Sequence, residues 1–167
     1  MAIMQVSRKI DYALRAVIHL ANEENSERAC SVAEIAARER VPRQFLEKII
    51  QDLIHKGLVR SQRGPQGGYL LARSADQMTF RDVIEAVEGP ISLNVCVGDH
   101  PDCFLLGACG MNRVWAEGQR RVMDLFENTT IAAVRHPRPA GASAAKNPEF
   151  PAPGGRLSAV TNALERG

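Results

Sequence analysis

The chain has 167 residues, of which 45% are hydrophobic and 24% are charged, and its net charge is +2. This composition is ordinary for a globular protein, and the length allows one compact domain with an appendage. No apolar run of about 18 residues, the length that suggests a transmembrane helix, is present. The start of the chain lacks the pattern of a signal peptide. We therefore expect a cytoplasmic protein with no membrane partner, whose thiols stay reduced.

The net charge conceals a segregation along the chain. Residues 1–75 carry 12 Lys and Arg against 8 Asp and Glu, residues 76–132 carry 4 against 9, and residues 133–167 carry 5 against 2. A basic amino-terminal half and an acidic middle favour a DNA-contacting module joined to a sensing or pairing module. A solvated surface of mixed charge gives similar counts, so charge alone does not decide between them.

Two amphipathic helices are expected first. Apolar residues recur at helical spacing from Ser7 to about Asn22. The pattern Ser31-Val-Ala-Glu34 is a capping box and predicts a second, short helix that ends near Arg40.

A third helix begins at Pro42 and ends at Gly57, where cations in the last turn precede a glycine. Its predicted buried stripe contains Phe45, Leu46, Ile49, Ile50, Leu53 and Ile54. Two helices separated by a few residues, the second with a polar face, make a helix-turn-helix.

Two strands are expected next, at Leu58–Arg60 and Tyr69–Leu71, on either side of the glycine-rich segment Gly64–Gly68. This pattern predicts a β-hairpin wing. A phosphate-binding P-loop is excluded because no G-K-[ST] follows the glycines and no helix begins there.

Two more helices and a tail follow. Thr79 caps one helix, and Gly89-Pro90 ends it. A longer helix is expected from Met111 to about Asn128. Alternating steps of four and three separate its residues Met111, Trp115, Gly118, Val122, Leu125 and Thr129. Such spacing suits a partner helix, although packing on its own domain fits equally. Five of the nine prolines lie within residues 137–153, which is the composition of a disordered tail.

The second helix of a helix-turn-helix presents its amino-terminal residues to base edges in the major groove. The candidates here are Arg43, Gln44, Glu47 and Lys48. Their side chains suit adenine, guanine and cytosine edges, whereas a solvated mixed-charge face is the alternative for this helix in isolation. Arg60 and Arg63 flank the hairpin tip, and Arg63 is placed to enter a minor groove or to contact phosphate.

Cys96, Cys103 and Cys109 lie in one short loop before the long helix. Thiolates are soft ligands suited to iron–sulfur clusters, zinc or copper. His100 lies in the same loop and is an alternative fourth ligand, although the gaps exceed the usual C-x₂₋₄-C spacing of zinc sites. A disulfide or sulfenic acid switch is a further alternative. Cys30 stands next to the Ser31 cap, away from this loop, and is expected to be a small packed or partly exposed residue. His19, His55 and His136 have no convergent partners, so we expect structural roles for them.

The opening Ser7–Arg15, the wing Arg63–Tyr69 and the three cysteines before a long helix resemble the IscR/NsrR/RirA family of winged-helix iron–sulfur transcriptional regulators. The resemblance covers roughly residues 4–132. It implies a homodimer in which the long helix pairs the subunits and an iron–sulfur cluster tunes operator binding. It also implies recognition-helix contacts at Gln44, Glu47 and Lys48, and a wing contact at Arg63.

The resemblance bears on the fourth cluster ligand as well. IscR-like members carry a His at the position that is Asn112 here. NsrR-like members lack that His and use an Asp in the first helix of the other subunit, and the matching residue is Asp11. The nearest resemblance is therefore to NsrR-like members, which implies a 4Fe-4S cluster ligated by Asp11, with 2Fe-2S as the alternative. The first gap between cysteines is six residues, where five is usual. Without the resemblance, Asp11 is a surface carboxylate paired with Arg15.

The sequence predicts a mainly α fold with a small β-hairpin. The expected parts are a winged helix-turn-helix DNA-binding domain in residues 1–75, a linking helix and cysteine cluster loop in 76–110, a dimerisation helix in 111–132 and a disordered tail in 133–167.

The predicted function is a DNA-binding transcriptional regulator, a repressor, that binds a double-stranded operator as a homodimer. An iron–sulfur cluster that senses nitric oxide, redox state or iron controls the binding. The alternative is a metal-free, zinc-based or thiol-based winged-helix regulator that acts through protein contact or cysteine oxidation. No nucleophile–base pattern or cofactor fingerprint is present, so neither enzymatic activity nor a small-molecule substrate is expected.

Overall fold

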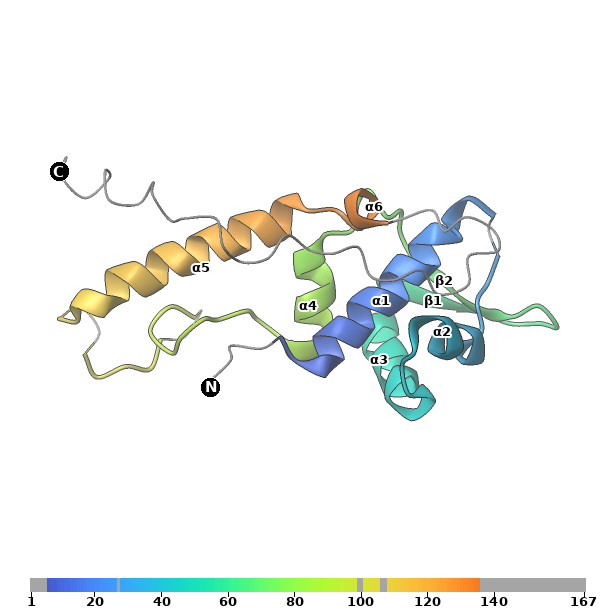
Figure 1. Ribbon diagram of the computed structural model, residues 1–167, viewed down its shortest axis with the longest axis horizontal. Helices are drawn as coiled ribbons and strands as arrows, with labels where there is room; N and C mark the ends of the chain where they lie inside the picture. Colours follow the sequence, from blue (N-terminus) through green and yellow to red (C-terminus); the bar gives the residue numbers. More distant parts are fainter. Residues whose placement is uncertain (1–5, 27, 99–100, 106–107, 136–167) are drawn as a thin grey trace. The chain divides into compact units, whose positions relative to one another are not determined.

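The computed structural model describes residues 6–26, 28–98, 101–105 and 108–135 (Figure 1). In chain order the elements are α1 (Arg8–Asn22), the 3₁₀ turn η1 (Glu24–Ser26), α2 (Val32–Glu39), α3 (Arg43–His55), β1 (Val59–Gln62), β2 (Gly68–Leu71), α4 (Phe80–Glu88), α5 (Gly110–Asn128) and α6 (Ile131–Val134). The predicted fold class, mainly α with one β-hairpin, is confirmed. The predicted tail from residue 136 onward lies outside the described residues.

Side-chain caps fix where α2 and α4 begin. At α4, Thr79 and Asp82 make both hydrogen bonds of a capping box, at 2.9 and 3.1 Å. At α2, the Ser31 hydroxyl accepts from the Glu34 N–H at 3.2 Å. The Glu34 carboxylate does not complete this second box, because it is bound by the Arg28 guanidinium. Both starts agree with the prediction.

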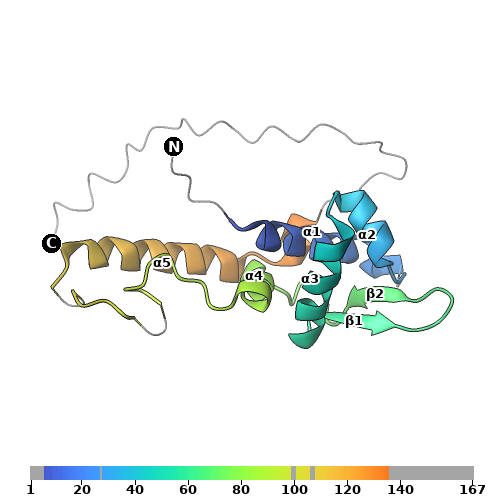
Figure 2. The ribbon, with the colours of Figure 1, turned by 90° about the horizontal axis from the view of Figure 1, so that it is seen from below.

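Helix α1 is central to the core and contacts α2, α3, α4 and α6 (Figure 2). Fully buried residues from these elements and the connection to α4 include Ala13, Val17, Ile35, Leu46, Ile50, Leu53, Met78, Val83 and Ile131. Burial of a large aliphatic side chain contributes about 1.5–3 kcal/mol. The core therefore forms from α1, α2, α3, α4 and α6, and no residue of α5 is fully buried in it.

The wing is a two-stranded antiparallel sheet in which Val59 pairs with Leu71. A further segment joins it, because the Cys30 N–H donates to the Tyr69 carbonyl at 3.0 Å and the Tyr69 N–H donates to the Cys30 carbonyl at 2.8 Å. A Cβ atom on Gly68 would lie 2.5 Å from the Cys30 oxygen, so glycine is required at this approach. The start of α2 is thereby fixed to the wing.

The turn between α2 and α3 depends on Arg40, which has φ 54° and is the non-glycine residue with positive φ among the described residues. Its N–H donates to the Ala36 carbonyl and ends α2. Val41 is then buried, and Pro42 precedes the first residue of α3. Glycine is the usual residue at a helix end of this kind, because a Cβ atom raises the energy of the left-handed backbone conformation.

A short helix that the sequence did not predict returns the chain to the core. The side chain of Ile131 is fully buried, and its N–H donates to the Met78 carbonyl at 2.8 Å. Thr130 pairs with Thr79 in an isolated β-bridge. Helix α6 therefore fastens the end of α5 beside the start of α4, at the point where the sequence analysis placed the beginning of the tail.

We expect Arg40→Gly to raise the free energy of unfolding by up to about 1 kcal/mol. Glycine removes a left-handed penalty of about 1–2 kcal/mol but gains entropy in the unfolded chain. The control is Arg38→Gly, inside α2, which should lower the free energy of unfolding by about 1 kcal/mol. Urea denaturation of the two variants measures both changes. A loss of stability in both variants contradicts the left-handed assignment of Arg40.

Candidate nucleic-acid interface and cysteine loop

An open cleft of about 890 Å³ lies between the start of α2, the start of α3 and strand β2. Its lining residues are Ser31, Val32, Ala33, Arg43, Gln44, Phe45, Glu47, Lys48, Gln51, Gly68 and Tyr69. All four base-reading candidates of the third helix are exposed and lie together in this lining. The sequence missed Ser31, Gln51 and Tyr69 as neighbours, because the cleft combines three elements.

One ion pair reduces the positive charge of this surface. The Arg43 Nε atom lies 2.8 Å from Glu47 Oε1, with side-chain exposures of 66% and 49%. An exposed pair at this spacing stabilises a helix only slightly. The Glu47 carboxylate also partly neutralises the positive charge of Arg43 on this surface.

Phe45 was predicted wrongly. It was placed in the buried stripe of the third helix, but 62% of its surface is exposed and it lines the cleft. The stripe is complete without it, because Leu46, Ile49 and Leu53 already follow the helical repeat and are buried. An exposed aromatic ring here can contact the methyl group of thymine.

The two wing arginines occupy different places. Arg63 is exposed and lies in the loop between β1 and β2. Arg60 is also exposed, but it lines a separate depression together with Glu24 and Arg73. The structure therefore does not bring Arg60 to the cleft of the third helix.

The cysteine loop leads directly into α5. All four cysteines are described, and none forms a disulfide; Cys96, Cys103 and Cys109 are partly exposed. No three of the donor atoms of these cysteines and Asp11 come within 4.8 Å of one another in the described structure. The three cysteines are thus near each other along the chain, but neither they nor Asp11 are gathered as around a single ion. His100 lies outside the described residues.

Two features of the loop concern the thiols directly. Cys109 is the residue before the first turn of α5, and its side chain makes no capping hydrogen bond to described residues. Asn112 donates from Nδ2 to the Cys96 carbonyl at 3.3 Å, so it holds the loop backbone.

Asp11 lies on α1 beside a groove of about 770 Å³ between α1, α4 and α5. Its carboxylate is bound by Arg15, with distances of 3.1 Å from Nε to Oδ1 and 3.0 Å from Nη2 to Oδ2. The side chain is 47% exposed. Within one chain Asp11 therefore has the i, i+4 pairing that the residues alone indicated.

None of the residues of α5 is fully buried in the described structure. One side faces its own chain: Gln119 accepts from the Leu93 N–H at 2.9 Å and donates to the Ile91 carbonyl at 2.7 Å. The ring centroids of Phe80 and Phe126 are 5.6 Å apart. These contacts hold α5 against α4 and the segment after it.

Next to the side that faces its own chain, α5 carries a row of exposed apolar residues. Met111, Val114 and Leu125 have exposures of 64%, 72% and 63%. The predicted seam is divided by this arrangement, because Val122 lines the groove of its own chain while Met111 and Leu125 point outward. Val114, which the seam omitted, completes the outward row.

Comparison with known proteins places this geometry in a family. Residues 6–137 match the Rrf2 family, described as iron-dependent transcriptional regulators. The chain belongs to the Rrf2 family. It is 35% identical over 130 residues to an Aquifex aeolicus chain named as an HTH-type transcriptional regulator, covering 77% of this chain and 89% of that one. It is 32% identical over 129 residues to IscR of Erwinia tasmaniensis, covering 77% of each.

Solved structures of the Rrf2 family agree in fold. CymR, the global cysteine regulator of B. subtilis, aligns with a TM-score of 0.67 and 28% identity over 80% of this chain and 97% of CymR. IscR of T. potens aligns with a TM-score of 0.64 and 28% identity over 78% of this chain and 85% of that one. The resemblance stated from the sequence is confirmed at the level of the family.

Membership of the Rrf2 family makes this chain a helix-turn-helix transcriptional regulator and not an enzyme. Helices α2 and α3 form the helix-turn-helix, and β1 and β2 form the wing (Figure 1). Among the described residues, no helix combines the length and apolarity needed to cross a membrane. The individual DNA contacts and the cluster ligands stay predictions.

We expect Glu47→Gln to strengthen binding to a non-specific DNA duplex, because it removes a negative charge and releases Arg43. The slope of log K against log salt should become steeper by roughly one unit, equivalent to one additional phosphate contact. Lys48→Gln is the matched change of opposite sign and should reduce the slope by about the same amount. Fluorescence anisotropy at several salt concentrations measures both slopes. Identical slopes in all three proteins would place this helix away from the phosphates.

Proposed function

We propose that this Rrf2 regulator binds its operator as a homodimer and that an iron–sulfur cluster on Cys96, Cys103 and Cys109 controls the binding. Three free thiols on the loop that leads into α5 carry the proposal. The family's description as iron-dependent, and IscR among the relatives, add support. The regulator acts as a repressor, and nitric oxide is the preferred signal, ahead of oxidants and iron scarcity.

The donor set fits a cluster better than a single ion. A zinc ion holds all its ligands at about 2.0–2.3 Å, so their donor atoms lie close together. The thiols of the loop and the Asp11 carboxylate are not gathered in that way in the described structure. Ligands on separate irons of a cluster lie farther apart than ligands on one ion. A bound cluster supplies iron atoms that react with nitric oxide and with oxidants.

Asp11 of the partner subunit completes the ligand set in this proposal. Half-exposure of the Asp11 side chain leaves it accessible to a second chain, and its place beside the groove next to α5 supports a role at the dimer interface. Arg15 must release the carboxylate for this to happen. The weak, exposed ion pair opposes such a release only slightly.

The outward side of α5 supports the homodimer. A 19-residue helix with no fully buried residue in the described structure, and with three large apolar side chains exposed, is suited to a partner surface. Phe104 and Val95 in the cysteine loop are 95% and 64% exposed and extend that surface. A second copy covers these residues and brings its first helix near the loop.

Contacts within the chain connect α5 to α3, the proposed recognition helix. Helix α5 contacts α4, and α4 contacts both α1 and α3. A displacement of α5 therefore reaches the helix that carries Gln44 and Lys48. In the dimer, it changes the separation of the two recognition helices, which must match the spacing of the operator half-sites.

Absorption spectra with iron and sulfide analysis on anaerobically purified full chain test the proposal. We expect visible cluster bands with about four irons per chain that bleach or shift with nitric oxide. Cys103→Ser should lose most of the iron, whereas Cys30→Ser, the matched change outside the loop, should retain it. A colourless protein that cannot be reconstituted contradicts the proposal.

Asp11→Ala tests the fourth ligand. We expect a shifted cluster spectrum and faster loss of iron in air, because one of four ligands is removed. Asp52→Ala is the control, since Asp52 is another exposed carboxylate with an ion pair, 2.9 Å from Lys9 Nζ. A spectrum and a loss rate equal to those of the control would remove Asp11 from the ligand set.

A second candidate function is a cluster-free regulator that senses through its thiols or through another protein. The similarity to CymR, the global cysteine regulator, favours this candidate. Iron analysis separates the two, because a regulator of this kind binds its operator fully without iron.

A further inference from the structure

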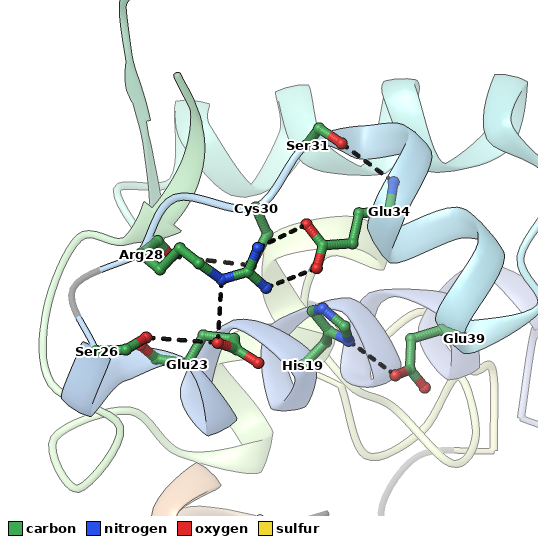
Figure 3. A network of polar contacts seen from close by, with 8 residues as sticks. All are labelled: His19, Glu23, Ser26, Arg28, Cys30, Ser31, Glu34 and Glu39. Carbon is green, nitrogen blue, oxygen red and sulfur yellow. Dashed lines mark hydrogen bonds and ion pairs between the residues drawn. The ribbon is translucent and has the colours of Figure 1, made fainter. Parts of the chain in front are cut away.

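Three potential metal ligands meet between α1 and α2, away from the cysteine loop. His19, Cys30 and Glu34 bring one ligand atom each within 4.8 Å of one another, and they are the group of this kind found among the described residues. Figure 3 shows them converging from α1, from the segment before α2 and from α2 itself. We propose that these three residues bind one zinc ion.

The His19 ring has a nitrogen that lacks a partner. The side chain is 93% buried, since its exposure is 7%. Nδ1 lies 3.0 Å from Glu39 Oε1, while Nε2 is buried and has no hydrogen-bond partner in the described structure. When Nδ1–H donates to the carboxylate, Nε2 carries a lone pair. A carboxylate behind a histidine is the arrangement that orients histidine ligands in metal sites.

Cys30 offers a thiol that has no exposure to solvent. Both of its backbone groups are used in the bridge to Tyr69, so the sulfur is what remains for a ligand. The thiol makes only a weak contact of 3.8 Å to the Arg28 carbonyl. Burial raises the pKa of Cys30 to about 11. Zinc binding therefore breaks the S–H bond, forms a Zn–S bond and releases one proton to solvent.

A cation already occupies part of this site. The Arg28 guanidinium binds Glu34 with both ends, at 2.6 Å from Nη2 to Oε1 and 3.2 Å from Nη1 to Oε2, and it lowers the pKa of the Glu34 carboxyl. The Arg28 side chain is 50% exposed and also contacts Glu23. It can therefore turn outward, keep one acidic partner and leave the Glu34 carboxylate to the ion.

One nitrogen, one sulfur and one carboxylate oxygen form a donor set that suits zinc and leaves a fourth position for water. Calcium and magnesium prefer oxygen ligands alone. The ion would connect α1 with the segment that pairs with the wing and with α2. It would thus stiffen the cleft that carries the DNA-reading residues, independently of any cluster in the loop.

The test uses the full chain with Cys96→Ser, Cys103→Ser and Cys109→Ser, so that Cys30 is the one remaining thiol. Cobalt(II) is titrated under a non-thiol reductant as a visible probe for zinc. We expect a sulfur-to-cobalt charge-transfer band and tetrahedral bands in the visible, saturating at one cobalt per chain and abolished by added zinc. Because the loop cysteines are absent, a failure of the cluster proposal leaves this result unaffected.

Variants in this background assign the ligands. Cys30→Ser should abolish the charge-transfer band, and Glu34→Gln should weaken cobalt binding by roughly tenfold or more. Arg28→Gln should strengthen it, because the competing cation is removed; a purely structural cluster gives no such gain. His55→Gln, which changes an exposed histidine at the end of α3, is the control and should bind as the parent does.

Circular dichroism shows whether each variant is folded. Absence of the band in a folded parent chain overturns the proposal, and so does a band that survives Cys30→Ser. If Cys30→Ser does not fold, Glu34→Gln and Arg28→Gln decide through their opposite effects. Equal affinity in both of them overturns the three-residue site.

Discussion

The backbone pairing between Cys30 and Tyr69 is the contact on which the cleft between α2, α3 and β2 depends. It joins the residue before the α2 cap to strand β2, and Gly68 permits the close approach of the two backbones. The helix-turn-helix and the wing are thereby held at a fixed spacing, although about 40 residues separate them in sequence. The cleft between them takes its shape from this contact, because its walls come from both sides of the bridge.

A second constraint is that the core is complete without α5. Helix α1 packs against α2, α3, α4 and α6, and the fully buried side chains come from these elements and their connections. Helix α5 is held by the hydrogen bonds of the Gln119 side chain and by the contact of Phe126, near its carboxyl end, with Phe80. Its outward apolar row therefore contributes nothing to the fold of one chain. The row is therefore the part of α5 that is open to the second chain of the proposed homodimer.

Local rules predicted the parts of this structure that depend on neighbours in sequence. The helix starts at Ser31 and Thr79 were found because a cap involves three or four adjacent residues. The pairing of Asp11 with Arg15 follows from helical spacing in the same way. Phe45 was misplaced because burial of a helix face depends on which elements cover it. Helix α6 was missed because four residues are too few to show a period.

The candidate sites also differ in whether neighbours in sequence or contacts in space define them. The thiol triad is visible in the sequence because one loop carries it, whereas a fourth ligand from another subunit leaves no local pattern. His19 and Cys30 were taken as structural residues because nothing in the sequence shows that a helix and a loop bring them together with Glu34. Arg28 gives no signal either, since its role depends on two carboxylates in space.

The return of the chain to the core through Ile131 fixes one end of α5. Its carboxyl end is fixed beside the start of α4 by the buried Ile131 side chain and the bridge from Thr130 to Thr79. Its 19 residues extend roughly 28 Å from that pivot to the end that carries Cys109. In the proposed regulator, a displacement of the thiol end would turn α5 about this fixed end. Such a turn would reach α3 through α4 as a change of angle.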